Sequence, residues 1–272
     1  MMVWVMMARL MMGLLVMGAG ACAQVLGADF GDYTLSGAGG ATGTGGSEGG
    51  ANVGGAGTGG TSESPMDILV LQSVDELDPT DTPVQGLMAT NHFAAVDLFD
   101  VAMATPTLTE LQAYDAVLVT SRNGIWADAF ALGDVLDAYH LAGGKVVVTA
   151  LGICQTEAIR GDFEQNLVFA PSGGLTAPVP PSVATLDITE DGAMFDGVAA
   201  LPTSMNYCQI SLANGAVAMA GVSGGDSAAP LVARRVVHGR TRVDVNLLFV
   251  SDYENNLPSV YALLANALRY PE

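Results

Sequence analysis

Residues 67–72 read DILVLQ, an almost unbroken run of large aliphatic side chains between two polar ones. A strand needs such a run when both of its faces are buried, because neither face then meets water. Strands of this kind occur in parallel sheets that helices cover on both sides. This short segment therefore predicts an α/β fold and places the first core strand of the chain.

Similar runs recur downstream and alternate with helical patterns. The strand-like runs are 95–101, 116–120 and 145–150, and the helical stretches are 84–93, a short one that opens at Thr107, and 127–141. Thr107 with Glu110 three residues later has the spacing of a capping box, in which each residue satisfies a backbone N–H of the other. This alternation predicts a mostly parallel, three-layer sheet with right-handed crossovers.

The C-terminal part has a different pattern. Three strand-like segments, 217–222, 231–237 and 241–250, follow one another, and His238-Gly239 forms a tight turn between the last two. Residues 257–268 then have helical periodicity. Consecutive strands joined by a tight turn pair in antiparallel fashion. We therefore expect an antiparallel C-terminal extension of the sheet and a closing helix.

The N-terminus has the order of an export signal. Residues 1–21 contain a single charge, Arg9, then an apolar run and four small residues directly before Cys22. This order is typical of a signal peptide, and the small-small-Cys ending resembles a bacterial lipobox, in which the cysteine is lipidated. Ala19 departs from that pattern, so ordinary cleavage near Ala21 and secretion stay open. An uncleaved anchor is a third reading, because 10–28 is an uncharged stretch of nearly spanning length.

The segments after the leader define the predicted domain organisation. Residues 22–35 form a short segment with a lipidated N-terminus, and 36–64 consist almost entirely of Gly, Ala, Thr and Ser. Such a composition cannot offset the entropy of ordering, and a coil of this length spans roughly 30 Å. Residues 65–272 form the folded domain. We expect a lipid-anchored protein of the cell envelope, in the periplasm or at the outer membrane.

The charge balance restricts the partners. The chain has 28 acidic and 9 basic residues, for a net charge of -19. An acidic surface repels phosphate backbones, which argues against nucleic-acid binding. No Cys/His set has the spacing of a metal site, so neither a metal nor a cofactor is predicted.

Several short segments, taken in order, resemble a known superfamily. They are YDAVLV at 114–119, LAGGKVVV at 141–148, MFDGV at 194–198, and PLVA at 230–233 followed by Gly239-Arg240. Over residues 66–270 the chain is similar to the class I glutamine amidotransferase-like superfamily, including its trehalose-utilisation-like branch. The resemblance implies a flavodoxin-like or Rossmann-like sheet.

The resemblance also marks where chemistry would lie. Active members carry a nucleophilic cysteine in Gly-x-Cys-x-Gly on a sharp strand-to-helix elbow, together with a histidine base. Gly152-Ile153-Cys154 matches the first half of that motif, but Thr156 replaces its second glycine and Val250 stands where the histidine is expected. The oxyanion-loop glycines are replaced by SRNG at 121–124. These departures argue against glutaminase chemistry.

Three uses of the remaining cysteines stay open. With Cys22 lipidated, Cys154 and Cys208 are left, and an exported protein meets an oxidising compartment. A Cys154–Cys208 disulfide is favoured over two inert thiols and over a catalytic Cys154.

Ligands of open parallel sheets bind beyond the carboxyl ends of the strands. The candidate ligand-binding residues there are Asp75, Ser121, Arg122, Asn123, Gln155, Ser251 and Asp252. Arg122 could bind a carboxylate, although a surface ion pair is the plainer role. The acidic loop that contains Asp75 lacks the order of a calcium loop, which favours a solvated loop.

The sequence therefore predicts a non-catalytic, membrane-tethered, amidotransferase-like module that binds a small molecule, a glycan or an envelope protein. One alternative is an envelope hydrolase or amidase that uses Cys154 or an acidic pair such as Asp75 and Asp252. A second alternative is a purely structural envelope protein.

Overall fold

The computed structural model describes most of the C-terminal three quarters of the chain. The described ranges are 64–73, 83–121, 124–154, 158–175, 185–201, 206–223, 229–248 and 257–271. All of them fall within one compact unit, Gly60–Glu272. The predicted leader, the lipidated Cys22, the segment 22–35 and nearly all of the tether 36–64 lie outside the described residues. Among the described helices, none is long and apolar enough to cross a membrane.

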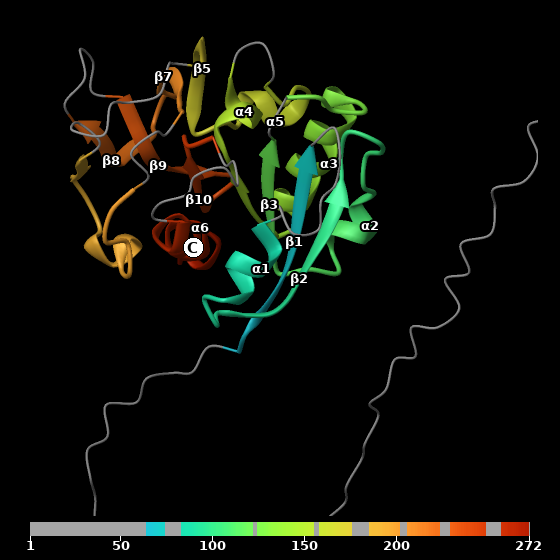
Figure 1. Cartoon of the computed structure of the whole chain (residues 1–272). Helices are drawn as coiled ribbons and strands as arrows, with labels where there is room; N and C mark the ends of the chain where they lie inside the picture. Colours follow the sequence, from blue (N-terminus) through green and yellow to red (C-terminus); the bar gives the residue numbers. More distant parts are fainter. Residues whose placement is uncertain are drawn as a thin grey trace, which may run out of the picture. The chain divides into compact units, whose positions relative to one another are not determined.

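A four-stranded parallel sheet forms the centre of the domain, as the alternating pattern predicts (Figure 1). Its strands are β1 (Met66–Ser73), β2 (Phe93–Asp100), β3 (Ala116–Ser121) and β4 (Lys145–Val148), in the order β2-β1-β3-β4. The stretch 67–72 lies in β1, between β2 and β3, and every residue from Ile68 to Ser73 is buried. The fold class predicted from this stretch is confirmed.

Alternate residues of β1 face two separate hydrophobic clusters. Ile68 and Val70 pack with Leu87 of α1 (Pro83–Met88) and with the buried residues of α6 (Leu257–Arg269). On the other face, Leu69 and Leu71 pack with residues of α2 (Leu108–Leu111), α3 (Ala129–Leu141), α4 (Ala150–Ile153) and α5 (Asp162–Gln165). Helices thus cover both faces of the sheet, which makes a three-layer architecture.

The predicted capping box is present at the start of α2. The Thr107 hydroxyl accepts a hydrogen bond from the backbone N–H of Glu110, and the Glu110 carboxylate accepts one from the backbone N–H of Thr107. The helix therefore begins where the sequence indicates.

The C-terminal half adds the expected antiparallel strands. A second four-stranded sheet has the order β10-β9-β8-β6, and its strands are β6 (Thr185–Ile188), β8 (Val217–Ser223), β9 (Ala229–Val237) and β10 (Arg240–Val245). A separate pair joins β5 (Phe169–Leu175) to β7 (Cys208–Leu212), and a short 3-10 helix, η1, spans Gly192–Phe195. His238 and Gly239 both have positive φ, 52° and 79°, as a tight hairpin turn requires.

A buried ion pair joins the two larger sheets. Strand β10 runs parallel to β4 where Thr149 bridges Val245, and the Asp244 carboxylate accepts a hydrogen bond from Val148 N at 3.1 Å. Arg242 donates to both oxygens of the same carboxylate, at 3.1 and 2.7 Å, and its guanidinium lies 3.8 Å from the centre of the Phe163 ring. Both charged side chains are fully buried. Where β4 and β10 meet, the Asp244 carboxylate thus accepts the hydrogen bond from Val148 N–H that a backbone carbonyl of a neighbouring strand would otherwise accept.

Three predicted elements are shorter than expected. The helix predicted at 84–93 ends at Met88, because the chain turns through Asn91, whose φ of 60° cannot continue a helix. The strand predicted at 145–150 ends at Val148 and is followed directly by α4. The strand predicted at 241–250 ends at Val245, since the Asn246 side chain binds the neighbouring backbone. No strand or helix was predicted from the sequence for six further elements, which are α4, α5, β5, β6, β7 and η1.

Candidate functional site

Only part of the predicted site lies within the described residues. Ser121, Cys154 and Cys208 are described; Asp75, Arg122, Asn123, Gln155, Thr156, Val250, Ser251 and Asp252 are not. Ser121 ends β3, is buried, and its hydroxyl accepts a hydrogen bond from Gly124 N at 2.6 Å. The Ser121 side chain therefore holds the turn after β3. The ligand-binding role proposed for the other six candidates stays a prediction.

Cys154 does not sit on a strand-to-helix elbow. Strand β4 ends at Val148, Thr149 is extended, and residues 150–153 form one helical turn, so that Cys154 is the residue after this turn. Its φ of -72° and ψ of 144° are ordinary extended values. A nucleophile elbow, by contrast, holds its reactive residue between strand and helix in a strained conformation. The sequence reading, which placed Cys154 directly after the strand, is corrected on this point.

Gly152 has a clear packing role in this turn. A Cβ at Gly152 would lie 2.3 Å from Cγ1 of Val148, which is too close for two carbon atoms. The helical turn therefore approaches β4 closely at Gly152. The first glycine of the Gly-x-Cys pattern is explained by packing of α4 against its own strand.

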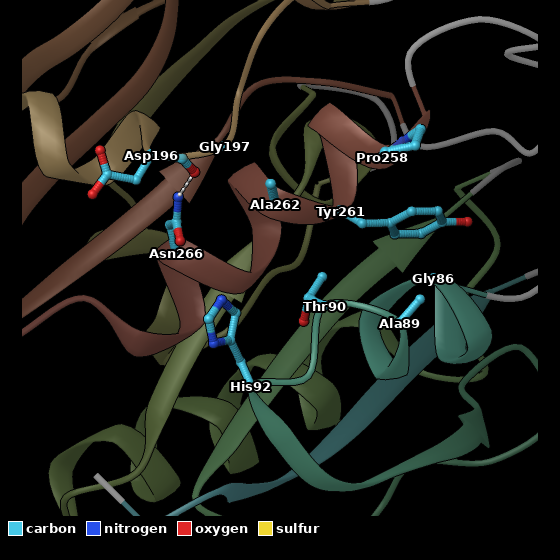
Figure 2. A pocket seen from close by; sticks show the side chains of 10 residues that line it. All are labelled: Gly86, Ala89, Thr90, His92, Asp196, Gly197, Pro258, Tyr261, Ala262 and Asn266. Atoms are coloured by element: carbon cyan, nitrogen blue, oxygen red, sulfur yellow. Dashed lines mark hydrogen bonds between the residues drawn. The ribbon is translucent and has the colours of Figure 1, made fainter. Parts of the chain in front are cut away.

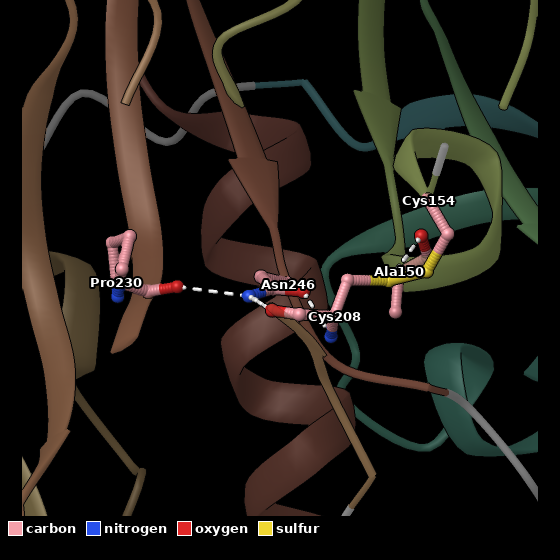
Figure 3. The surroundings of a disulfide bond; sticks show 5 residues. All are labelled: Ala150, Cys154, Cys208, Pro230 and Asn246. Carbon is pink, nitrogen blue, oxygen red and sulfur yellow. Dashed lines mark hydrogen bonds between the residues drawn. A yellow bond between two sulfur atoms is a disulfide. The ribbon is translucent and has the colours of Figure 1, made fainter. Parts of the chain in front are cut away.

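The predicted Cys154–Cys208 disulfide is present (Figure 3). The Cα atoms of the two cysteines are 5.8 Å apart, and both residues are fully buried. The bond joins the end of α4 to the first residue of β7, 54 positions later. The Sγ of Cys208 also lies 3.0 Å from the carbonyl oxygen of Ala150, a contact without a donated proton because a disulfide sulfur has none.

Asn246 fixes the Cys208 end of this bond (Figure 3). Its Oδ1 accepts from the backbone N–H of Cys208 at 2.9 Å, and its Nδ2 donates to the carbonyl oxygens of Cys208 and Pro230, both at 3.0 Å. Asn246 is fully buried, so these bonds replace the strand pairing that ends at Val245. Sequence reasoning missed Asn246, and an asparagine after a strand gives no signal of such a role.

All three histidines of the chain lie at the opposite edge of the sheet from Cys154. His92 directly precedes β2, His140 is near the end of α3 and before β4, and His238 is in the turn before β10. Because these strands run in one direction, all three positions are at the amino edge. Cys154 follows the carboxyl end of β4, about 13 Å away for a strand of its length. No histidine is therefore placed to serve as a base for Cys154.

Two of these histidines form a polar cluster on α3 and the β9–β10 turn. Nδ1 of His140 is 3.1 Å from the carbonyl oxygen of Gly144, and the His140 and His238 rings are 6.3 Å apart. His238 Nε2 contacts the Asp137 carboxylate at 3.2 Å. Burial lowers the pKa of His140, because the charged ring loses its hydration. Within the described part of the chain, no group of three acidic, His or Cys side chains could hold a metal ion.

A cavity of about 400 Å³ lies between α1 and α6, in a place that the sequence did not indicate (Figure 2). The residues around it come from α1 and the turn after it, from the end of η1 and from α6. On α6 they include Pro258, Ala262 and Asn266, which recur every four residues and so share one helix face. That spacing was visible in the sequence, but it indicated only a helix.

Comparison with solved structures shows a shared fold at low sequence identity. A cytoplasmic protein from Salmonella typhimurium matches with a TM-score of 0.56 and 12% identity, over 75% of this chain and 98% of that one. A second cytoplasmic protein of the same organism gives 0.54 and 12%, over 74% and 98%. A ThuA-like protein from Bacteroides uniformis gives 0.52 and 13%, over 78% and 94%.

No protein-family model and no curated protein matches the chain. At these identities the structural matches establish the fold alone, which is a flavodoxin-like α/β fold shared with a ThuA-like protein.

Proposed function

We propose that this chain is an exported, membrane-tethered, amidotransferase-like binding module that has no glutaminase chemistry. The observation that carries the proposal is the state of Cys154. The cysteine at the sequence position of the family nucleophile is bonded to Cys208 and fully buried.

The chemistry of the site supports this reading. A cysteine attacks as a thiolate, and a sulfur in a disulfide has neither a proton to lose nor a free valence. The turn that carries Cys154 is not an elbow, and the three histidines lie at the other edge of the sheet. Each of these facts alone would weaken thiol catalysis, and they act together.

The proposed location rests on the leader and agrees with the cysteine chemistry. Residues 1–21 followed by Cys22 have the order of a lipoprotein signal. Disulfides persist outside the cytosol, where reducing systems do not reach them, so an exported chain is the one expected to keep Cys154 bonded to Cys208. The bound partner would be a small molecule, a glycan or an envelope protein.

Two measurements on the full chain test the proposal. Alkylation followed by intact-mass analysis of protein purified from a bacterial envelope fraction is expected to find no free thiol at Cys154. A glutamine-hydrolysis assay is expected to give the same background for the wild-type chain and for Cys154→Ala. A free, alkylatable Cys154 together with activity that Cys154→Ala abolishes would replace the proposal with the hydrolase alternative.

The tether is tested separately. Cys22→Ser is expected to move the chain from the membrane fraction to the soluble exported fraction, because acylation requires the thiol. If both forms stay in the cytosol, the proposed location is wrong, while the result on Cys154 still stands.

A further inference from the structure

We propose that the cavity between α1 and α6 binds a small, neutral amide with an apolar body. The proposal goes beyond the proposed function, which names neither this site nor a ligand class. It rests on three features of the described residues: the shape of the cavity, a hydrogen-bond donor of fixed tautomer, and an acceptor of fixed orientation.

Small residues create the space. Gly86 and Ala89 on the α1 side face Ala262 on α6, and the Tyr261 ring packs directly over Gly86. A Cβ at Gly86 would lie 2.0 Å from that ring, so only glycine at this position leaves room for the Tyr261 ring beside the cavity. The volume of about 400 Å³ falls in the range of small-molecule sites, and such sites combine apolar walls with few polar groups.

His92 supplies the donor. Its Nδ1 is 3.1 Å from Nη1 of Arg269. A guanidinium can only donate, so Nδ1 must accept and the proton of the neutral ring must be on Nε2. Burial and the charge of Arg269 lower the pKa of His92, which keeps the ring neutral at neutral pH. The Nε2–H has no hydrogen-bond partner among the described residues.

Asn266 supplies the acceptor. Its Nδ2 donates to the carbonyl oxygens of Met194 and Asp196, both at 2.9 Å. These two bonds fix the carboxamide with Oδ1 turned away from them, and this oxygen also has no partner in the described part of the chain. Figure 2 shows His92 and Asn266 on the same side of the cavity, with the Tyr261 ring on the other.

The chemical class of the ligand follows from this pair. An amide group carries both an acceptor for His92 Nε2–H and a donor for Asn266 Oδ1, and an apolar body fits the remaining walls. A carboxylate is disfavoured, because it has no proton to donate to Asn266 Oδ1. A purely apolar molecule would displace water from His92 Nε2 and Asn266 Oδ1 without replacing its hydrogen bonds.

Benzamide is the probe that tests the site on the full chain. Ring nitrogen correlations of ¹⁵N-labelled histidine report the tautomer directly, and the chain has only 3 histidines. The His92 ring is expected to show the Nε2–H form, and its Nε2 signal is expected to shift saturably with benzamide. Benzoate keeps an acceptor for His92 but has no donor for Asn266, and it is expected to bind about tenfold more weakly, as the loss of one hydrogen bond allows. Toluene matches the ring but lacks the whole amide, so it loses both hydrogen bonds and is expected to bind more weakly still.

Matched variants separate recognition from folding. Ala262→Leu, on α6, and Ala89→Leu, in the turn after α1, fill the cavity from opposite sides and are expected to abolish benzamide binding. Ala131→Leu, on the exposed side of α3, is the control and is expected to leave it unchanged. His92→Phe keeps a ring in place but removes the donor, and it is expected to reduce the preference for benzamide over toluene by about tenfold, because the Asn266 acceptor remains.

Two results would overturn the proposal. Equal binding of benzamide and toluene to the wild-type chain would show that His92 and Asn266 do not contribute to recognition of the amide. Benzamide binding that survives in whichever filling variant remains folded would place the ligand elsewhere. The thiol state of Cys154 affects neither result, so this site and the proposed function can fail independently.

Discussion

The two edges of the central sheet use their polar side chains in different ways. At the carboxyl edge, where ligands of this fold usually bind, Cys154 is bonded to Cys208 and the amide of Asn246 is occupied by backbone groups. Toward the amino edge, His92 and Asn266 line a cavity. His92 Nε2 and Asn266 Oδ1 have no hydrogen-bond partner among the described residues. The comparison teaches that polar side chains at one edge of a sheet can serve only to hold the structure, while polar atoms near the other edge stay unpaired.

The physical reason is that a buried polar atom needs a partner. Where the protein supplies the partner, as Asn246 does for Cys208, the group stabilises the fold and is not available to a ligand. Where the protein fixes only one end of a side chain, as Arg269 does for His92, the other end stays oriented and free to bind. Three changes measure how far this contrast between the edges holds.

The largest expected effect comes from removing the disulfide at the carboxyl edge. The double variant Cys154→Ala, Cys208→Ala is expected to lower the free energy of unfolding by about 4 kcal/mol. The disulfide joins residues 54 positions apart and so restricts the unfolded chain, and its removal gives that entropy back to the unfolded state. Urea unfolding monitored by circular dichroism measures the change.

Cys22→Ser is the control for cysteine loss and is expected to leave the unfolding midpoint unchanged. If the double variant keeps the wild-type stability, the carboxyl edge is not held by this bond, and the contrast with the amino edge fails.

A smaller effect is expected from the amide that supports the disulfide. Asn246→Asp keeps the size of the side chain but removes both donated hydrogen bonds, to Cys208 and Pro230, and buries a carboxylate beside two carbonyl oxygens. We expect a loss of about 2 to 3 kcal/mol in the free energy of unfolding.

Asn91→Asp, at an exposed turn position, is the matched control and is expected to change stability by less than about 0.5 kcal/mol. An Asn246→Asp protein as stable as this control would mean that the amide is not needed to hold Cys208.

The smallest effect concerns the amino edge and depends on pH. Burial lowers the pKa of His140 in the folded chain, so the unfolded chain takes up this proton first as the pH falls. Stability is therefore fully present above the ordinary histidine pKa of about 6.5 and is lost as the pH falls from there through the folded pKa. Urea unfolding at pH 7.5 and 5.5 measures the loss.

His140→Gln is expected to reduce this loss, since the variant has no ring to protonate. Titration of the His140 ring by nuclear magnetic resonance gives its pKa directly. A His140 that titrates above the ordinary value would reverse the sign and contradict the prediction.

Much of the fold could be predicted because it depends on local patterns. Continuous apolar runs identified β1, β3 and β4, the spacing of Thr107 and Glu110 identified the start of α2, and His238-Gly239 identified a hairpin. Element ends were less accurate, because the end of β10 at Val245 depends on a side chain that reaches another strand. The edge strands β5, β6 and β7 lack long apolar runs and gave no comparable signal.

The sequence alone determined that the domain is α/β, that its charge is strongly acidic, and that Cys154 and Cys208 are available to pair, because composition and periodicity are properties of the chain itself. Only the tertiary structure decided that Cys154 follows a helical turn and that every histidine lies at the other edge. It alone also placed His92 and Asn266, 174 positions apart, around one cavity. Such arrangements depend on contacts between distant segments, and spacing along one chain cannot specify them.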